Sequence, residues 1–422
     1  MPNARKLAVK TLLKIERDNA YSNITLNSIL KEAKLENEDK SLFSALVYGV
    51  LDRKITLDYV LSGFMKTPIK KTAPFTLNCL RAGLYQIMYM DKIPTSAAVN
   101  EAVKIIKASK ESRNSGFVNA VLRKAATTEI KLPEGNTAEA LSIRYSAPLW
   151  ICESFIADYG SENAESLLLE SLKPPPVILR VNTTKTTRED LILRLKESGI
   201  KAEKGETEDS VIIEKGMDIS ANPLYKEGLF YAQDYASQRA VSMLNPKPNS
   251  RVLDLCAAPG GKSFTMACLM ENKGEIISCD LYEKRVGLID SSAKRLGLDI
   301  IKPAVNNAIV FNSALGEFDF VLCDVPCSGL GVIRRKPELK YKTDCDFSEL
   351  LDIQYKILCN AVKYLKKGGK LLYSTCTLRS VENEKLVICL EKEYNELSKV
   401  YEHTFMPHTD GTDGFYCALF EK

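Results

Sequence analysis

The chain has 422 residues, of which 45% are hydrophobic and 27% charged, and it carries a formal net charge of +4. This length predicts two or three domains, and the composition is typical of a globular protein rather than a disordered or fibrous one. No apolar run is long enough to cross a bilayer, and no basic-then-apolar stretch opens the chain. We therefore expect neither a membrane protein nor a signal peptide.

Cysteine and histidine usage bears on metals and on the redox compartment. The 12 cysteines include no CxxC pair, and the only two histidines are His403 and His408. This pattern is unlike that of a zinc site, and free cysteines in such number are typical of a reducing compartment. We expect a cytoplasmic protein without a metal.

Charge is unevenly distributed along the chain. Residues 1–130 hold 21 of the 58 basic residues and 12 of the 54 acidic ones, which leaves 37 basic and 42 acidic residues in the remainder. A basic front part favours a polyanionic partner such as RNA. Ordinary solvated helix faces would produce the same count, so charge alone leaves both interpretations open.

Residues 4 to about 128 are predicted to be helical throughout. Apolar residues recur at helical spacing in ARKLAVKTLLKIE and in SLFSALVYGVLDRKITLDYVLSGF, and no strand-like alternation interrupts them. The pattern predicts an all-α bundle over residues 1–128.

A short linker and a small mixed domain are expected next. Residues 130–142 contain Pro, Gly and Asn and are predicted to be a linker. The stretch VILRVN predicts a strand, TREDLILRLKESG a helix, and KAEKGETEDSVIIEKG further strand. This succession predicts a small α+β domain over residues 143–229.

The last domain, residues 230–422, is predicted to alternate strands and helices. A helix over residues 230–251 is expected to lead into it. The predicted strands are RVLDLC, EIISCD, IKPAVN, FDFVLCDV and GKLLYST, and GFYCALFEK is expected to be a final antiparallel strand. Such alternation predicts a doubly wound α/β sheet of the Rossmann-like type, whose ligand lies outside the carboxyl ends of the strands.

A turn rich in small residues follows the first of these strands. It consists of Cys256, Ala257, Ala258, Pro259, Gly260, Gly261 and Lys262. A phosphate-binding P-loop would need Gly where Cys256 stands, and GxGxxG is absent. The next strand ends at Asp280, whose carboxylate suits the hydroxyls of a ribose. A nucleoside pocket with little provision for phosphate favours S-adenosylmethionine as the cofactor.

Two cysteines come directly after other strands of this domain. Cys327 follows FDFVLCDVP and Cys376 follows GKLLYST, so both belong to the sheet edge that carries the small-residue turn. A thiolate there could act as a nucleophile. Adding a thiolate to carbon 6 of a pyrimidine activates carbon 5 for methylation, and an acid near N3, such as Asp324, would stabilise the adduct.

The front domain resembles a known RNA-binding module. The stretches LVYGVLDRKITLDYVL, LRAGLYQIMYMDKIPTSAAVNEAV and GFVNAVLR are similar to the NusB-type domain. The resemblance covers nearly all of residues 1–128 and implies an all-α module that contacts RNA, without identifying the RNA.

The last domain resembles the RNA cytosine-C5 methyltransferases. The motifs that carry the resemblance are CAAPGGKS, DVPCSGLGVIRRKPELK, YSTCTL, ENE and DGFYCALF. Together with the NusB-like front they are similar to the Sun/RsmB branch, which methylates a cytosine of 16S ribosomal RNA.

The resemblance implies roles for particular residues. Cys376 would attack carbon 6 of the cytosine, and Cys327 would assist release of the product. The turn residues from Cys256 to Lys262, with Asp280 and Asp324, fall on the family's cofactor-binding positions. In addition, we expect Arg334, Arg335 and Lys336 near RNA phosphates, although a solvated loop would look the same.

Two positions depart from the family pattern. The family usually has an Asp for the adenine after the third strand, where this chain has Asn306 and Asn307. The amide of Asn307 can still donate and accept hydrogen bonds, so we assign it to the cofactor site. Tyr341 stands where Trp is common, and it retains an aromatic face.

The partner implied is 16S rRNA with an unpaired or flipped-out cytosine, because stacking hides carbon 6. We therefore expect free or early-assembly rRNA as the substrate, and a monomeric enzyme. Two alternatives stay open: the same reaction on tRNA, and a non-catalytic RNA-binding or antitermination factor with an inactive methyltransferase domain.

Overall fold

The computed structural model describes residues 3–18, 20–33, 35–214, 218–342 and 347–422. The chain folds into two compact units. The helical unit comprises Met1–Lys173 and Ile333–Lys342, and the sheet unit comprises Pro174–Val332 and Thr343–Lys422. Among the described residues, no helix has the length and apolar character needed to cross a membrane.

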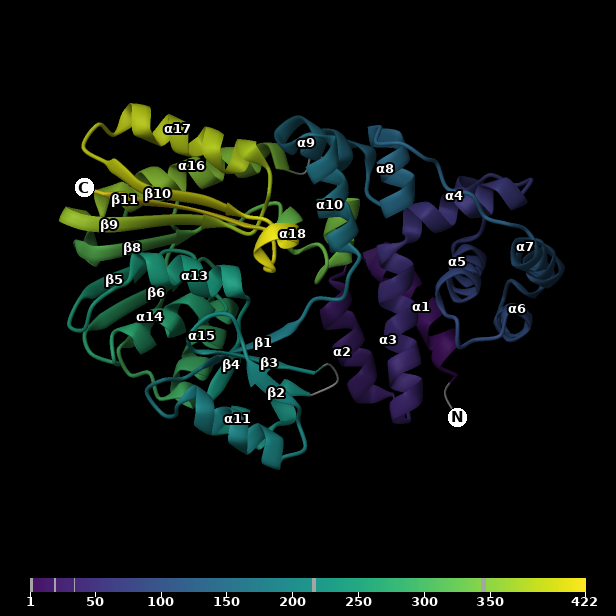
Figure 1. Ribbon diagram of the computed structural model, residues 1–422, viewed down its shortest axis with the longest axis horizontal. Helices are drawn as coiled ribbons and strands as arrows, with labels where there is room; N and C mark the ends of the chain where they lie inside the picture. The colour runs from purple at the N-terminus through teal and green to yellow at the C-terminus, as the bar shows by residue number, and fades with distance from the viewer. Residues whose placement is uncertain (1–2, 19, 34, 215–217, 343–346) are drawn as a thin grey trace. The chain divides into compact units, whose positions relative to one another are not determined.

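The helical unit contains the all-α bundle predicted for the front of the chain (Figure 1). Its helices are α1 (Ala4–Asp18), α2 (Ser22–Glu32), α3 (Asn37–Asp52), α4 (Lys54–Phe64), α5 (Pro74–Tyr89), α6 (Thr95–Lys107), α7 (Ser115–Thr127), α8 (Ala138–Tyr145), α9 (Leu149–Tyr159) and α10 (Ser161–Ser171). The helical spacing of apolar residues produces this bundle, because Ala8, Leu12 and Ile15 on α1 are all buried in its core.

One buried cation organises the middle of this bundle. Arg81 on α5 donates two hydrogen bonds of 2.7 Å to the carboxylate of Asp58. It donates a third, of 2.8 Å, to Glu16. A buried guanidinium is tolerated because its donors are paired with carboxylates in this way.

The sheet unit begins with a four-stranded sheet in the order β2-β3-β1-β4. Its strands are β1 (Val177–Val181), β2 (Ala202–Lys204), β3 (Ser210–Ile213) and β4 (Phe230–Ala232), with α11 (Arg188–Glu197) between β1 and β2. The strand and helix predicted for this region are confirmed.

The prediction of a helix over residues 230–251 is wrong at both ends. Phe230–Ala232 forms β4, which pairs antiparallel with β1, and α13 spans only Tyr235–Leu244. The Asp234 side chain accepts a hydrogen bond from the Ala236 backbone N–H and caps this helix. A partner strand distant in sequence therefore decides where the helix begins.

The second sheet has seven strands in the order β10-β11-β9-β8-β5-β6-β7. The strands are β5 (Arg251–Asp254), β6 (Glu275–Asp280), β7 (Ile301–Val305), β8 (Phe318–Asp324), β9 (Leu365–Thr375), β10 (Ser398–Phe405) and β11 (Phe415–Glu421). β5 to β9 pair in parallel, whereas β11 pairs antiparallel with β9, as predicted. The edge strand β10 was not predicted, because its sequence is mostly polar.

Helices cover both faces of this sheet (Figure 1). One face packs against α13, α14 (Gly261–Leu269) and α15 (Glu283–Leu296), and the other against α16 (Ser348–Lys363) and α17 (Glu384–Glu393). Adjacent strand residues face opposite cores, as Val252 and Leu253 do. The fold is the predicted Rossmann-like type, and the carboxyl ends of its parallel strands meet at one edge.

Candidate active site

The small-residue turn after β5 is held tightly by backbone hydrogen bonds. The Ala257 N–H donates to the Cys279 carbonyl over 2.7 Å, and the Gly260 N–H donates to the Ala257 carbonyl over 2.7 Å. Arg285 donates to the Ala258 carbonyl over 2.9 Å, and the Ala258–Pro259 peptide bond is cis. The turn therefore has a defined backbone at the end of the strand.

Gly260 is required where this turn enters helix α14. Its φ is +110°, a region that L side chains rarely adopt. A Cβ at this position would come within 2.3 Å of the Phe264 ring. Gly261 then begins α14, so the first backbone N–H groups of the helix lie beside the turn. These groups are a general site for an anionic group.

Asp254, at the end of β5, lies beneath the turn with only 1% of its surface exposed. Ser263 donates a hydrogen bond of 2.7 Å to its Oδ2, and Ser278 donates in turn to Ser263 over 2.8 Å. Burial raises the pKa of Asp254 to about 7, and the hydrogen bond from Ser263 opposes this shift. The carboxyl group therefore takes up a proton near neutral pH.

Lys262 and Asp324 form an ion pair at the same strand ends. The Lys262 Nζ donates to Asp324 Oδ2 over 2.7 Å, and Ser374 Oγ donates to Asp324 Oδ1 over 2.8 Å. Burial disfavours the charged ammonium, but the Asp324 carboxylate outweighs burial, so the pKa of Lys262 is raised. Lys262 keeps its positive charge at this edge of the sheet.

The two predicted catalytic cysteines are in direct contact. Their Sγ atoms lie 3.1 Å apart, and both residues are half-buried and form no disulfide. The hydrogen bond to Cys376 and burial together raise the pKa of the Cys327 thiol well above its ordinary value. Lys262 also interacts electrostatically with Cys376. This arrangement favours a proton on Cys327 and places the Lys262 ammonium where it acts on Cys376.

A buried glutamate that sequence reasoning did not assign holds the Cys327 loop. Glu382 is fully buried, and its Oε2 accepts hydrogen bonds of 2.9 Å from the Ser328 N–H and from Gln354 Nε2. The Gln354 Nε2 also donates to the Pro326 carbonyl over 2.9 Å. The ENE motif is the feature of the sequence that marks Glu382 as a candidate residue. The motif does not reveal which loop Glu382 supports.

The two cysteine-bearing segments are also joined through their backbones. The Gly331 N–H donates to the Cys376 carbonyl over 3.0 Å, and the Gly414 N–H donates to the Gly331 carbonyl over 2.9 Å. A Cβ on Gly331 would come within 1.9 Å of the Gly414 oxygen. Only glycine fits at this position, so the loop after Cys327 is packed directly against the strand end that bears Cys376.

The predicted cofactor residues farther along the edge have protein partners of their own. Asp280 is buried, pairs with Arg285 at 3.1 Å and accepts a hydrogen bond from the Tyr282 N–H. Asn307 is exposed, and its Oδ1 accepts from the Ile309 N–H over 3.3 Å. Its neighbour Asn306 is buried, and its Nδ2 has no hydrogen-bond partner in the described parts of the chain.

Gln233 is a further candidate, which the sequence patterns did not single out. It follows β4 and has 9% of its surface exposed. Its Oε1 accepts a hydrogen bond of 2.8 Å from Thr265, whereas its Nε2 lacks a partner among the described residues. That Nε2 lies 3.7 Å from the position of a Cβ on Gly261. A buried donor without a partner therefore points at the helix N-terminus.

Arg334, Arg335 and Lys336, which we expect near RNA phosphates, lie in a segment that folds as part of the helical unit. Lys336 is exposed there. The Tyr341 hydroxyl donates to the Leu51 carbonyl over 2.5 Å, and Lys54 lies over the Tyr341 ring. The aromatic face that we assigned to Tyr341 is thus directed to protein groups.

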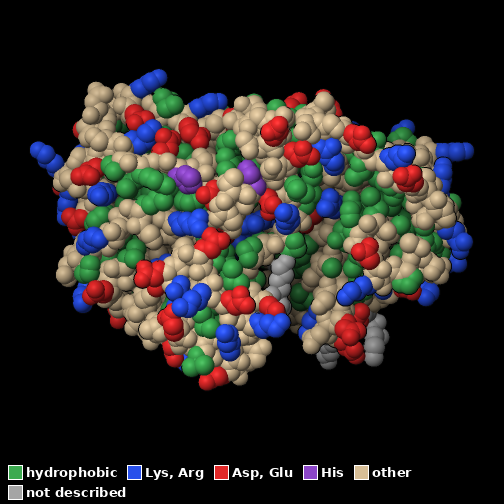
Figure 2. All heavy atoms as spheres, in the orientation of Figure 1, with side chains coloured by type: hydrophobic (Ala, Val, Ile, Leu, Met, Phe, Trp, Pro, Cys, Tyr) green, Lys and Arg blue, Asp and Glu red, His purple; other side chains and the backbone are tan. Residues whose placement is uncertain are grey.

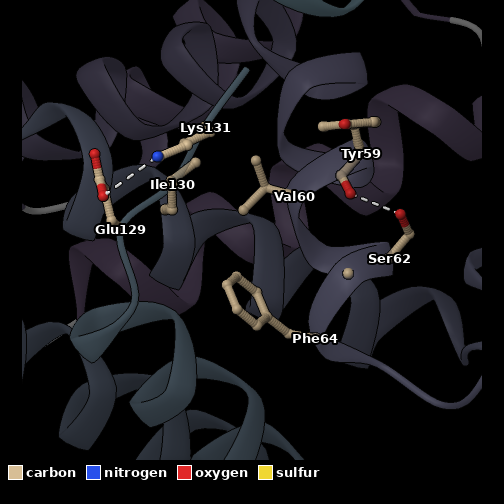
Figure 3. A pocket seen from close by; sticks show the side chains of 8 residues that line it. Tyr59, Val60, Ser62, Phe64, Glu129, Ile130 and Lys131 are labelled. Carbon is tan, nitrogen blue, oxygen red and sulfur yellow. Dashed lines mark hydrogen bonds and ion pairs between the residues drawn. The ribbon is translucent and has the colours of Figure 1, made fainter. Parts of the chain in front are cut away.

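A separate cavity of about 290 Å³ lies in the helical unit (Figure 3). It is lined by Tyr59, Val60, Ser62, Gly63, Phe64, Glu129, Ile130 and Lys131. None of these residues was predicted to bind the cofactor or to react, so the cavity lies outside the candidate active site.

Comparison with known proteins matches three family models to consecutive parts of the chain. Residues 2–127 match the NusB family, and residues 147–220 match the ferredoxin-like domain of RsmF/B-like methyltransferases. Residues 241–421 match the family described as 16S rRNA methyltransferase RsmB/F. The matches follow the order of the bundle, the small sheet and the large sheet.

Curated relatives match over the whole chain. A probable ribosomal RNA small subunit methyltransferase B of Bacillus subtilis is 38% identical over 100% of this chain and 99% of its own. A probable ribosomal RNA small subunit methyltransferase B of Synechocystis is 32% identical over 100% of both chains.

Solved structures match as well. The crystal structure of PH0851 covers 100% of this chain and 99% of its own, with a TM-score of 0.85 and 26% identity. The structure of NSun6 from Pyrococcus horikoshii with SFG covers 64% of this chain and 97% of its own, with a TM-score of 0.60 and 23% identity.

The raised pKa of Asp254 predicts a specific pH dependence of stability. Between its ordinary pKa of about 4 and its folded value of about 7, the unfolded carboxyl is ionised while the folded one keeps its proton. Its contribution to the free energy of unfolding therefore falls as pH rises through this window. We therefore expect the free energy of unfolding of Asp254→Asn, relative to that of the native protein, to rise by about 1 kcal/mol per pH unit from pH 4.5 to 7. Urea unfolding at several pH values measures this difference.

Asp319 provides a control of opposite sign. Burial raises its pKa, but the hydrogen bonds from Lys366 and from the Arg251 N–H outweigh burial, so the net shift is downward. Asp319→Asn should therefore lose stability relative to the native protein only as pH rises toward the ordinary Asp pKa of about 4, and the difference should stay constant from pH 4.5 to 7. A difference between Asp254→Asn and the native protein that stays constant with pH would contradict the assignment.

Proposed function

Because the chain belongs to the 16S rRNA methyltransferase RsmB/F family, we propose that it methylates carbon 5 of a cytosine in 16S rRNA through a covalent adduct with Cys376. The observation that carries this proposal is the contact between two thiols beside Lys262 at the strand ends. A methyltransferase acting on a ring nitrogen needs no such thiol, whereas carbon 5 must first be activated by addition at carbon 6.

The residues around the turn fit S-adenosylmethionine. Glycines at positions 260 and 261 leave room for a close approach of the ligand. The N-terminus of α14 and the unpartnered amide of Gln233 would bind its carboxylate. The turn from Cys256 to Lys262, with Asp280, Asn307 and Asp324, would hold the remainder. When bound, this cofactor supplies an electrophilic methyl group.

We assign the nucleophile to Cys376. Only a thiolate adds readily to carbon 6, and the positive charge of Lys262 favours the thiolate of Cys376 while Cys327 keeps its proton. Addition forms the bond between Cys376 Sγ and carbon 6, and N3 takes up a proton from solvent. Carbon 5 then carries the electron density that accepts the methyl group.

Release is assigned to Cys327. Once Cys376 is a thioether it bears no negative charge, so the main cause of the raised pKa of Cys327 disappears, and this thiol can lose its proton to solvent. The thiolate of Cys327 then removes the proton from carbon 5. The bond between carbon 6 and Cys376 breaks, its electron pair returns to Cys376, and N3 gives up its proton.

The helical unit would capture the RNA. It contains exposed basic residues where its loops meet the N-terminal ends of α5 and α7; these are Lys66, Lys70, Lys71, Lys110 and Arg113. Figure 2 shows Lys and Arg side chains at the α4, α6 and α7 end of the unit. Such groups neutralise RNA phosphates. The target cytosine must be unpaired, which favours free or early-assembly 16S rRNA.

The substrate is tested by methylating defined transcripts with labelled cofactor. We expect label in protein-free 16S rRNA, at a single cytosine carbon 5, and none in tRNA. Label in tRNA alone would replace the rRNA proposal by the same reaction on tRNA. No label in any transcript, with RNA binding retained, would favour a non-catalytic RNA-binding factor.

The cysteine roles predict opposite effects of two substitutions. Cys376→Ala should lower the methylation rate by roughly 10³-fold or more, because it removes the nucleophile. Cys327→Ala should still add to the cytosine but fail to release it, which leaves a protein–RNA band that resists SDS. If Cys376→Ala produces this band and Cys327→Ala does not, the roles are reversed.

The assignment of Gln233 predicts a change in cofactor affinity. Gln233→Leu should weaken S-adenosylmethionine binding by about 10-fold, because a hydrogen bond to a charged group contributes roughly 1.5–3 kcal/mol. Thr265→Val is the matched control, because it breaks the hydrogen bond to Gln233 Oε1 but keeps the amide donor. Equal affinities of Gln233→Leu and Thr265→Val in calorimetric titration would reject the assignment.

A further inference from the structure

The stretch of chain that follows Cys327 is divided between the two units. Cys327–Val332 belongs to the sheet unit, and Ile333–Lys342 belongs to the helical unit. The first part is bound to the second cysteine segment through the hydrogen bond from the Gly331 N–H to the Cys376 carbonyl. The loop that carries Cys327 therefore continues directly into a segment that is folded with the helices.

That segment contains a short 3-10 helix, η6 (Pro337–Tyr341), which packs on the C-terminal end of α3. Lys340 Nζ donates to the Asp52 carbonyl over 3.0 Å, and the Tyr341 hydroxyl donates to the Leu51 carbonyl over 2.5 Å. The last carbonyls of a helix have no partner within the helix. A cation and a hydroxyl from η6 satisfy two of them.

Lys340 is unusual because its side chain is completely buried, with 0% of its surface exposed. The carboxylate of Asp52 lies 3.7 Å away, and the negative end of the α3 dipole adds to its attraction. A buried ammonium is costly to keep for stability alone, since an apolar side chain of similar size would pack there without that cost. A buried ammonium bonded to a helix end therefore fits a role in fixing where the segment lies.

The other end of η6 is anchored independently. The Glu338 carboxylate accepts a hydrogen bond of 2.6 Å from the Ser22 hydroxyl and one of 3.2 Å from the Ser22 N–H. Ser22 begins α2, so a carboxylate is placed at a helix N-terminus, where its charge is favoured. The segment is thus attached to the start of one helix and to the end of another.

We propose that Lys340 and Tyr341 are positioning residues for Cys327, which act by holding the continuation of its loop on α3. The proposal rests on the release step proposed for Cys327 above. That step requires the Cys327 sulfur to reach the carbon-5 proton after Cys376 is already bonded to carbon 6. Nucleophilic addition by Cys376 does not have this requirement, so a loosened segment should slow release and leave addition intact.

The test compares Lys340→Met and Tyr341→Phe with the native full-length protein on 16S rRNA transcripts. Lys340→Met removes the charge at similar size. Tyr341→Phe removes only a hydroxyl and keeps the ring, so we expect it to fold even if Lys340→Met does not. Rates of adduct formation and of adduct decay are measured separately, as the appearance and loss of the SDS-resistant band. We expect adduct decay to slow by about 10-fold or more, because small displacements of a reacting group are costly, with formation unchanged.

Arg81→Met is the matched control. It removes another buried cation from the same unit, whose hydrogen bonds go to Asp58 and Glu16 rather than to the segment after Cys327. It should lower stability without accumulating adduct. Accumulation with Arg81→Met equal to that with Lys340→Met, or native decay rates in both Lys340→Met and Tyr341→Phe, would overturn the proposal.

Cys327→Ala separates failure of this inference from failure of the proposed function. If Cys327→Ala forms no adduct, the covalent route itself fails. If Cys327→Ala accumulates adduct while Lys340→Met and Tyr341→Phe release it normally, the covalent route stands and the positioning role fails.

Discussion

The contact between the sulfurs of Cys327 and Cys376, 3.1 Å apart, is the interaction around which the active site is organised. Two thiolates at that distance would repel strongly, so the contact disfavours loss of the proton from both sulfurs. The surrounding groups then decide which sulfur keeps it. Lys262 acts on Cys376, whereas Cys327 lies in a buried loop held by Glu382 and Gln354.

A second group of interacting charged side chains lies at the same strand ends. Asp254 and Asp324 both interact with Lys262, which donates its hydrogen bond to Asp324 only. Asp324 is hydrogen-bonded to Lys262 and Ser374, and the buried Asp254 retains a proton up to about pH 7. Lys262 therefore keeps its positive charge beside the thiols, and the protonated Asp254 adds no negative charge beneath the turn.

Chain connectivity links this chemistry to the helical unit. The loop after Cys327 passes through Gly331, where only glycine fits, and continues into η6, where a buried lysine meets the end of a helix. The Cys327 loop itself is held by Glu382 and Gln354 of the sheet unit, whereas its continuation folds with the bundle that matches the NusB family.

The sequence by itself determined the helical character of the front bundle and the order of helices and parallel strands in the last domain, together with the set of residues at those strand ends. It could do so because hydrophobic periodicity and motifs such as CAAPGGK depend on neighbours in the chain, and parallel strands bring their carboxyl ends to one edge. Tertiary structure alone decided that Phe230 starts a strand, that Gln233 aims an unpartnered amide at α14, and that Tyr341 bonds to Leu51. These outcomes depend on contacts between segments far apart in the chain, which no local pattern records.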